Sequence, residues 1–189
     1  MKTNQESLEL RAHSAVPWVV GSILGGCTGT PLVIKATSSW YREIELPNFT
    51  PPDKIFAPVW TALYGTVGYV GWAIHNAVGW KSFALRFYAF HYVLNLLWAP
   101  LFFGLQRIRA AQVLNFFLLA SLGSVMAAFL SISPLCSILL TPYFAWLSFA
   151  TVLNGAICRL NPTVKGYNEA MLQAGIQRLR AEAGKRAGL

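Results

Sequence analysis

Three tryptophans, Trp60, Trp98 and Trp146, lie inside long apolar stretches of this chain. A tryptophan at the end of such a stretch is typically an interfacial anchor, but these three lie deeper and have polar residues or prolines as neighbours. Indole rings stack on flat partners and lose little side-chain entropy in doing so. Three of them among small residues therefore predict a slot for a flat, apolar ligand.

Two amides, Asn95 and Asn154, and one imidazole, His91, also lie within apolar stretches. In such surroundings each amide needs partners, so an interhelical hydrogen bond is the ordinary role and ligand contact the alternative. His91 precedes Asn95 by four residues, which places both on one face of a helix. The sequence leaves two roles open for His91, a hydrogen-bonding packer and an axial ligand of haem iron.

Acidic residues are absent from 55 to 168, so catalysis by paired carboxylates is excluded there. The chain is 55% hydrophobic and 12% charged, whereas soluble domains are about 25% charged. An ionised side chain at the centre of a bilayer costs roughly 2.5–3.5 kcal/mol. The composition therefore predicts an integral membrane protein. Its net charge of +8 is concentrated in the tails and short connections, which suits contact with membrane lipids and predicts no nucleic-acid partner.

The apolar stretches predict an all-α fold, an integral membrane bundle of five transmembrane helices. Each has about the 20 residues that a spanning helix needs, and the short links make successive helices antiparallel neighbours. The predicted spans cover about 15–36, 55–80, 83–105, 111–131 and 135–160, within a domain over 15–162. A polar tail (1–14) precedes this domain and a basic tail (163–189) follows it. The loop over 37–54 is rich in aromatic residues and prolines and is predicted to be a structured cap.

The basic residues predict the orientation of the bundle. Four of them fall on the side of the N-terminus and eleven on the side of the long loop and the C-terminus. By the positive-inside rule, the loop and the C-terminus are expected to be cytoplasmic. The membrane would be the mitochondrial outer membrane or another organelle membrane in a eukaryote, and the cell membrane in a bacterium.

Several motifs, in order along the predicted spans, make the chain similar to one known family. They are Leu24–Gly26 with Gly29, Trp40–Tyr41, Thr50–Pro52, Phe56–Thr61, Leu94–Asn95 with Trp98, Pro100–Gly104 and Pro142–Asn154. Together they resemble the translocator protein family (TspO/MBR, the peripheral-type benzodiazepine receptor family).

The resemblance implies a bundle, usually a homodimer, with a ligand cavity beneath the first loop. The resemblance implies that the protein requires no cofactor. The ligands that it implies are tetrapyrroles such as protoporphyrin IX and haem, with sterols such as cholesterol or other lipids as a second class. Carried over by position, the ligand-binding residues would be Tyr41, Phe56, Ala57, Trp60, Asn95, Trp98, Val113, Phe117, Trp146, Phe149, Ala150 and Leu153.

The chain departs from the family pattern at several positions. Gly155 stands where the sterol motif has a tyrosine, between a matching Val152 and Arg159, which weakens the case for cholesterol. Phe90 replaces a glycine linked to dimerisation, so a dimer could instead use the glycines of the first span. His91 replaces a common glutamine, which favours haem contact slightly.

Two functions of different classes follow. The first is a receptor or transporter-like protein that binds tetrapyrroles between its helices. The second is an enzyme for light- and oxygen-dependent porphyrin degradation, in which Trp60 and Trp146 would carry radical chemistry. A scaffold that acts through its basic tail is a weaker third hypothesis.

Overall fold

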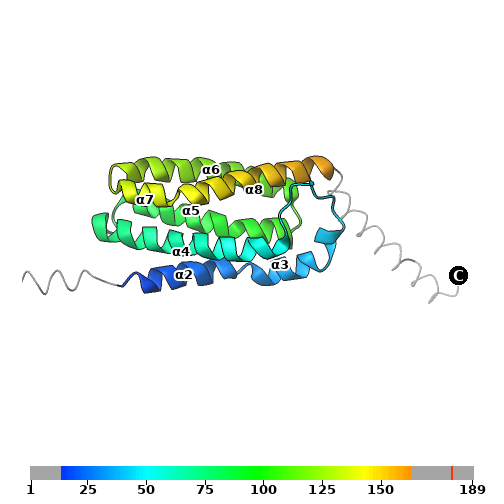
Figure 1. Cartoon of the computed structure of the whole chain (residues 1–189), viewed down its shortest axis with the longest axis horizontal. Coiled ribbons are helices and arrows are strands. Elements are labelled where there is room, and N and C mark those ends of the chain that lie inside the picture. Colours follow the sequence, from blue (N-terminus) through cyan, green and yellow to red (C-terminus); the bar gives the residue numbers. More distant parts are fainter. Residues whose placement is uncertain (1–13, 163–179, 181–189) are drawn as a thin grey trace, which may run out of the picture.

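The computed structural model describes residues 14–162 and residue 180. Apart from Ser14 and Arg180, the predicted tails lie outside this part of the chain. The secondary structure of the described residues is helical, and the helices run side by side along one axis (Figure 1). In chain order the elements are α2 (Val16–Cys27), α3 (Thr30–Thr37), the 3-10 turn η1 (Trp40–Arg42), α4 (Asp53–Val78), α5 (Phe83–Ala99), the π-helical turn η2 (Pro100–Gly104), α6 (Ile108–Leu130), α7 (Pro134–Leu139) and α8 (Thr141–Leu160).

The all-helical prediction is confirmed, but three of the predicted spans are not single regular helices. The first is broken between α2 and α3, just before Pro31, and the last between α7 and α8, just before Pro142. The third changes to a π-helical turn at Pro100. Proline lacks the amide hydrogen that an α-helix needs at its interior positions. Hydropathy alone does not register this interruption.

Within the described residues, four helical segments are long and apolar enough to cross a membrane: 16–37, 83–104, 108–130 and 134–160. The second predicted span, which is α4, has 26 residues but is not among them. It begins with Asp53 and Lys54 and carries Tyr64, Thr66 and His75 farther on, all of which lower its mean hydropathy. Because α4 packs against α2, α5 and α7, it is part of the same bundle.

The first span meets α4 at very close range. The Ser22 hydroxyl donates a hydrogen bond of 2.6 Å to the Tyr64 carbonyl oxygen. A Cβ atom on Gly68 would overlap the backbone of Trp18 and Val19, so glycine is what permits this crossing. Beyond the break, α3 packs against η1 and η2 instead. This change of partner leaves room between α3 and the first turns of α4.

The glycine stripe of the first span is used largely inside the bundle. A Cβ on Gly25 would overlap the Tyr92 hydroxyl, and one on Gly29 would press on the Ala99 methyl group. A Cβ on Gly21 would meet nothing within 4 Å. The stripe as a whole is therefore not a free surface for a second copy, and the homodimer stays a prediction.

The loop between α3 and α4 is packed against the end of the bundle. Trp40 and Tyr41 of η1 are buried in a cluster with Phe102 of η2. Farther along the loop, Asn161 at the end of α8 donates to the Glu45 carbonyl oxygen at 2.8 Å. It also accepts from the Glu45 amide at 3.0 Å. These contacts hold the loop over the space between the helices.

Candidate ligand-binding site

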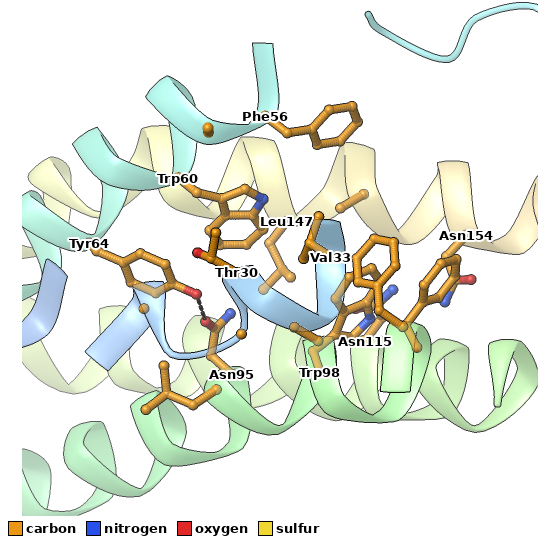
Figure 2. A pocket seen from close by; sticks show the side chains of 18 of the residues that line it. Thr30, Val33, Phe56, Trp60, Tyr64, Asn95, Trp98, Asn115, Leu147 and Asn154 are labelled. Carbon is orange, nitrogen blue, oxygen red and sulfur yellow. Dashed lines mark hydrogen bonds between the residues drawn. The ribbon is translucent and has the colours of Figure 1, made fainter. Parts of the chain in front are cut away.

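A cavity of about 290 Å³ lies beneath the loop, between α3, α4, α5, α6 and α8. Figure 2 shows its side chains converging from these helices. The predicted site residues that line it are Tyr41, Phe56, Ala57, Trp60, Asn95, Trp98, Ala150 and Leu153. The structure thus brings together predicted residues from the loop and from three helices. That they contact a ligand stays a prediction.

One wall of the cavity is a stack of aromatic rings on α4. The Trp60 indole stacks on the Tyr64 ring with centroids 5.5 Å apart, and its edge meets Tyr143 of α8 at 6.3 Å. The Tyr64 hydroxyl donates to Asn95 Oδ1 of α5 at 2.8 Å, which Figure 2 draws as a dashed line. Asn95 therefore has the ordinary interhelical role and also helps to fix the aromatic wall.

A second aromatic wall lies under the loop. Trp98 of α5 stacks on Phe102 of η2 with centroids 4.8 Å apart, and the edge of Phe102 meets Tyr41 at 6.2 Å. Burial raises the pKa of Tyr41 to about 12, and the nearby Asp53 carboxylate adds to this shift. Tyr41 therefore presents a neutral phenol where the loop closes the cavity.

The cavity is open between α3 and the first half of α4. Thr30, Ala57 and Thr61 line it and are exposed at the surface of the bundle. Asp53 also lines it from the first turn of α4. Among the described residues that line the cavity, Asp53 alone is charged, so its interior is apolar and neutral.

The predicted contributions of α6 are wrong in their helical face. Val113 is 55% exposed and Phe117 is 63% exposed, and neither lines the cavity. The residues of α6 that do so are Asn115 and Leu118, which are almost fully buried. Because nearly every position of this helix is apolar, its hydrophobic pattern does not mark an inner face. The amide of Asn115 was the signal that sequence reasoning missed.

Trp146 and Phe149 of α8 lie beside the cavity rather than in its wall. The Trp146 ring packs against Phe56 with centroids 5.8 Å apart, and Phe149 meets Phe49 of the loop at 6.4 Å. Neither residue lines the cavity. Of the three indoles that predicted a slot, Trp60 and Trp98 face the cavity, and Trp146 supports Phe56 from behind.

The geometry of His91 argues against the haem-ligand hypothesis. Its side chain is 1% exposed and does not line the cavity. Nε2 lies 2.9 Å from the Tyr143 hydroxyl and Nδ1 lies 2.7 Å from the Ser121 hydroxyl. Ser121 donates its proton to the Leu118 carbonyl oxygen, so it accepts from Nδ1–H, and Nε2 accepts from Tyr143. Both ring nitrogens are therefore engaged, which favours the hydrogen-bonding role over iron ligation, the other role that the sequence left open.

Several lining residues were not predicted as part of the site. They include Thr30 and Val33 of α3, Tyr64 of α4, and Leu147 and Asn154 of α8. Sequence reasoning treated α3 as an uninterrupted part of the first span. Because the break after Cys27 was not foreseen, neither was the place of α3 in the lining of the cavity.

Comparison with known proteins agrees with this architecture. Residues 15–160 match the TspO/MBR family. The chain is 36% identical over 141 residues to the tryptophan-rich protein TspO of Chlorobaculum tepidum, covering 72% of this chain and 89% of that protein. It is 34% identical over 157 residues to the translocator protein of Sus scrofa, covering 80% and 92%. Protein CrtK of Rhodobacter capsulatus is 30% identical over 144 residues, covering 74% and 89%. The chain is therefore an integral membrane protein that belongs to the TspO/MBR family.

Proposed function

We propose that this protein is a membrane receptor or transporter-like protein that binds a tetrapyrrole, such as protoporphyrin IX or haem, in the cavity beneath its loop. The observation that carries the proposal is the pair of aromatic walls, Trp60 on Tyr64 and Trp98 on Phe102, on either side of a neutral, apolar space. Flat conjugated rings bind well between such walls.

The size of the cavity limits how a ligand would sit. Its volume of about 290 Å³ is at the lower end of the roughly 300–1,000 Å³ that is usual for ligand pockets. A tetrapyrrole would therefore place part of its ring between the aromatic walls and the rest in the opening between α3 and α4. Its ionised propionates would stay at that opening, where Lys54 lies next to Asp53 in sequence.

Sterols and other lipids are a second ligand class with less support. Gly155 has the Gln112 side chain beside it, with Nε2 about 3.3 Å from where a Cβ would be. A tyrosine at this position, as in the family's sterol motif, would have to displace Gln112. The packing of α6 on α8 is thus adapted to the absence of that ring.

Porphyrin degradation is less favoured than binding. In the hypothesis from sequence Trp60 carries the radical chemistry and Trp146 assists, and of these two only Trp60 lines the cavity. Illumination of the complex would distinguish the two functions. Binding alone leaves the Soret band intact, whereas degradation converts it into a new absorption that depends on Trp60.

Tryptophan quenching by protoporphyrin IX tests the proposal on the full chain purified in detergent. Saturable quenching is expected, and Trp60→Phe should weaken affinity several-fold because Trp60 forms part of the cavity wall. Trp80→Phe is the matched control, since Trp80 is 57% exposed and stacks on Trp18 outside the cavity. Absence of saturation, or equal affinity of Trp60→Phe and the wild type, would overturn the proposal.

A further inference from the structure

Two arginines lie at the loop end of the bundle, where α6 begins and α8 ends. Arg109 is in the first turn of α6, and Arg159 is in the last turn of α8. Both side chains are exposed, and neither lines the cavity beneath the loop. The pair is therefore on the outer surface and separate from the candidate ligand-binding site.

Contacts between the two helices bring the arginines to one seam, the line along which α6 and α8 pack. Arg109 Nη2 donates to the Pro162 carbonyl oxygen at 2.8 Å, just beyond the end of α8. One turn farther into the bundle, Gln112 of α6 lies beside Gly155 of α8, with Nε2 about 3.3 Å from where a Cβ on the glycine would be. Arg159 Nε donates to the Gly155 carbonyl oxygen at 3.4 Å, so this side chain turns back along the same seam.

The positive charge of the pair is not neutralised within the described residues. Both guanidinium groups hydrogen bond to carbonyl oxygens, which carry no net charge. Glu45 of the loop meets this end of α8 through its backbone, which exchanges hydrogen bonds with the Asn161 side chain. Arg107, one residue before α6, is exposed and adds a third positive charge. Because a guanidinium group has five N–H donors, each arginine keeps donors for an anionic group.

Apolar side chains continue from the arginines toward the middle of the two spans. Val113 and Phe116 follow Arg109 on one face of α6 at spacings of four and seven residues, and they are 55% and 59% exposed. Val152 precedes Arg159 by seven residues on α8 and is 59% exposed. A positive end followed by an exposed apolar face matches the order of a phospholipid, in which the charged headgroup precedes the acyl chains.

The chemistry of the seam favours a charged lipid over a sterol. A sterol hydroxyl carries no charge and would leave both guanidinium groups uncompensated. Gly155 also lacks the tyrosine ring of the family's sterol motif, and Gln112 lies beside it instead. A phosphate group supplies the missing negative charge, and the planar fork of arginine suits its oxygens.

We propose that Arg109 and Arg159 hold the phosphate group of an anionic phospholipid on the outer surface of the bundle. The ester groups of this lipid lie beside Gln112, one turn deeper, and an acyl chain follows Val113 and Val152. This lipid site does not depend on tetrapyrrole binding, because none of these residues lines the cavity.

Native mass spectrometry of the full chain in mild detergent tests the site by counting bound lipids during a titration. Palmitoyl-oleoyl phosphatidylglycerol should bind saturably and roughly tenfold more tightly than palmitoyl-oleoyl phosphatidylcholine, which has the same chains and no net charge. Neither cholesterol nor glycerol 3-phosphate should displace it at equal concentration. Equal binding of the two phospholipids would overturn the proposal. Displacement by cholesterol would indicate a sterol site, and displacement by glycerol 3-phosphate would indicate a site for free phosphate; both would overturn it.

Variants locate the bound lipid on the seam. A basic residue near a membrane surface contributes roughly fivefold to the affinity for anionic lipid, so the double variant Arg109→Gln/Arg159→Gln should bind phosphatidylglycerol roughly ten- to thirtyfold more weakly. The matched control is Lys35→Gln/Arg42→Gln, which removes the same charge from exposed side chains at the same end of the bundle. Figure 1 shows α3, which carries Lys35, on the other side of the bundle from α6 and α8.

The control variant should lose less than threefold in affinity, and the basic tail contributes equally to every variant because all of them keep it. An equal loss in the two double variants would mean diffuse attraction and would overturn the site. Arg159→Gln alone removes only one long hydrogen bond within the chain, so it keeps the test valid if the double variant does not fold. It should weaken phosphatidylglycerol binding roughly fivefold, and unchanged binding would overturn the proposal.

Discussion

Replacing His91 with leucine tests the hydrogen-bond network that the structure places in the core of the bundle. His91 links α5 to α6 through Ser121 and to α8 through Tyr143, with distances of 2.7 and 2.9 Å. Leucine has a similar volume and cannot pair with either hydroxyl. Ser121 would keep its bond to the Leu118 carbonyl oxygen. Tyr143, which is 2% exposed, would be left with a buried hydroxyl group and no described partner.

The expected loss follows from these contacts. Hydrogen bonds between transmembrane helices contribute about 0.6 kcal/mol each on average, and a buried hydroxyl left unpaired costs roughly 1–3 kcal/mol. His91→Leu should therefore lower the free energy of unfolding by about 1–3 kcal/mol and the Tm by several degrees. His91→Gln should recover most of this loss, because a carboxamide can donate to Ser121 and accept from Tyr143.

Thermal unfolding in detergent measures the effect, and a double variant shows its cause. His91→Leu combined with Tyr143→Phe removes the orphaned hydroxyl, so the pair should lose less than the sum of the single variants. Haem titration is the second readout, and His91→Gln should leave the Soret position of the bound haem unchanged. Strict additivity of the pair would refute the network, and loss of a haem signal in His91→Gln would restore His91 as an iron ligand.

Three further changes probe the site. Ala150→Thr should weaken ligand affinity by adding volume and a hydroxyl to the α8 wall, and unchanged affinity in the quenching titration would contradict the place of Ala150 in the site. Asn161→Ala removes both hydrogen bonds to the Glu45 backbone and should lower the stability of the closed loop by about 1 kcal/mol. The expected results are faster ligand release and faster proteolysis between residues 43 and 50. Phe117→Ala should change ligand affinity less than twofold, because the Phe117 side chain is exposed. Leu118→Ala should weaken ligand binding more than this, because Leu118 lines the cavity. The reverse order of the two effects would support the face of α6 predicted from the sequence.

The fold was predictable because the lengths of the apolar stretches and the shortness of their links leave few arrangements in a bilayer. The breaks within the stretches were not. The break after Cys27 and the second start at Thr141 depend on backbone geometry near prolines, which hydropathy does not encode. The low mean hydropathy of α4 reflects its place in the site, since one face of α4 contributes Trp60, Thr61 and Tyr64 to the cavity.

The site was predictable where side-chain chemistry is unusual for its surroundings. Trp60, Asn95 and Trp98 are conspicuous within apolar helices, and all three line the cavity. Val113 and Phe117 are ordinary apolar residues, and their assignment rested on position in a resembling family alone. On a helix that is apolar all round, position fixes depth in the membrane better than it fixes the inward face.

Asn115 shows how the inward face of such a helix can be recognised. A carboxamide exposed to hydrocarbon would lack partners, so an amide inside an apolar run must turn toward the protein interior. On α6 this places Asn115 on the buried face, together with Ala111, Leu118 and Leu122, at the three- and four-residue spacings of one helical stripe. The same stripe excludes Val113 and Phe117, whose side chains are displaced around the axis. The residue that identifies the face is thus also one whose amide nitrogen has no partner among the described residues. For this reason the buried face of α6 follows from one side chain, and because Asn115 lines the cavity, Asn115→Leu should change ligand affinity more than stability.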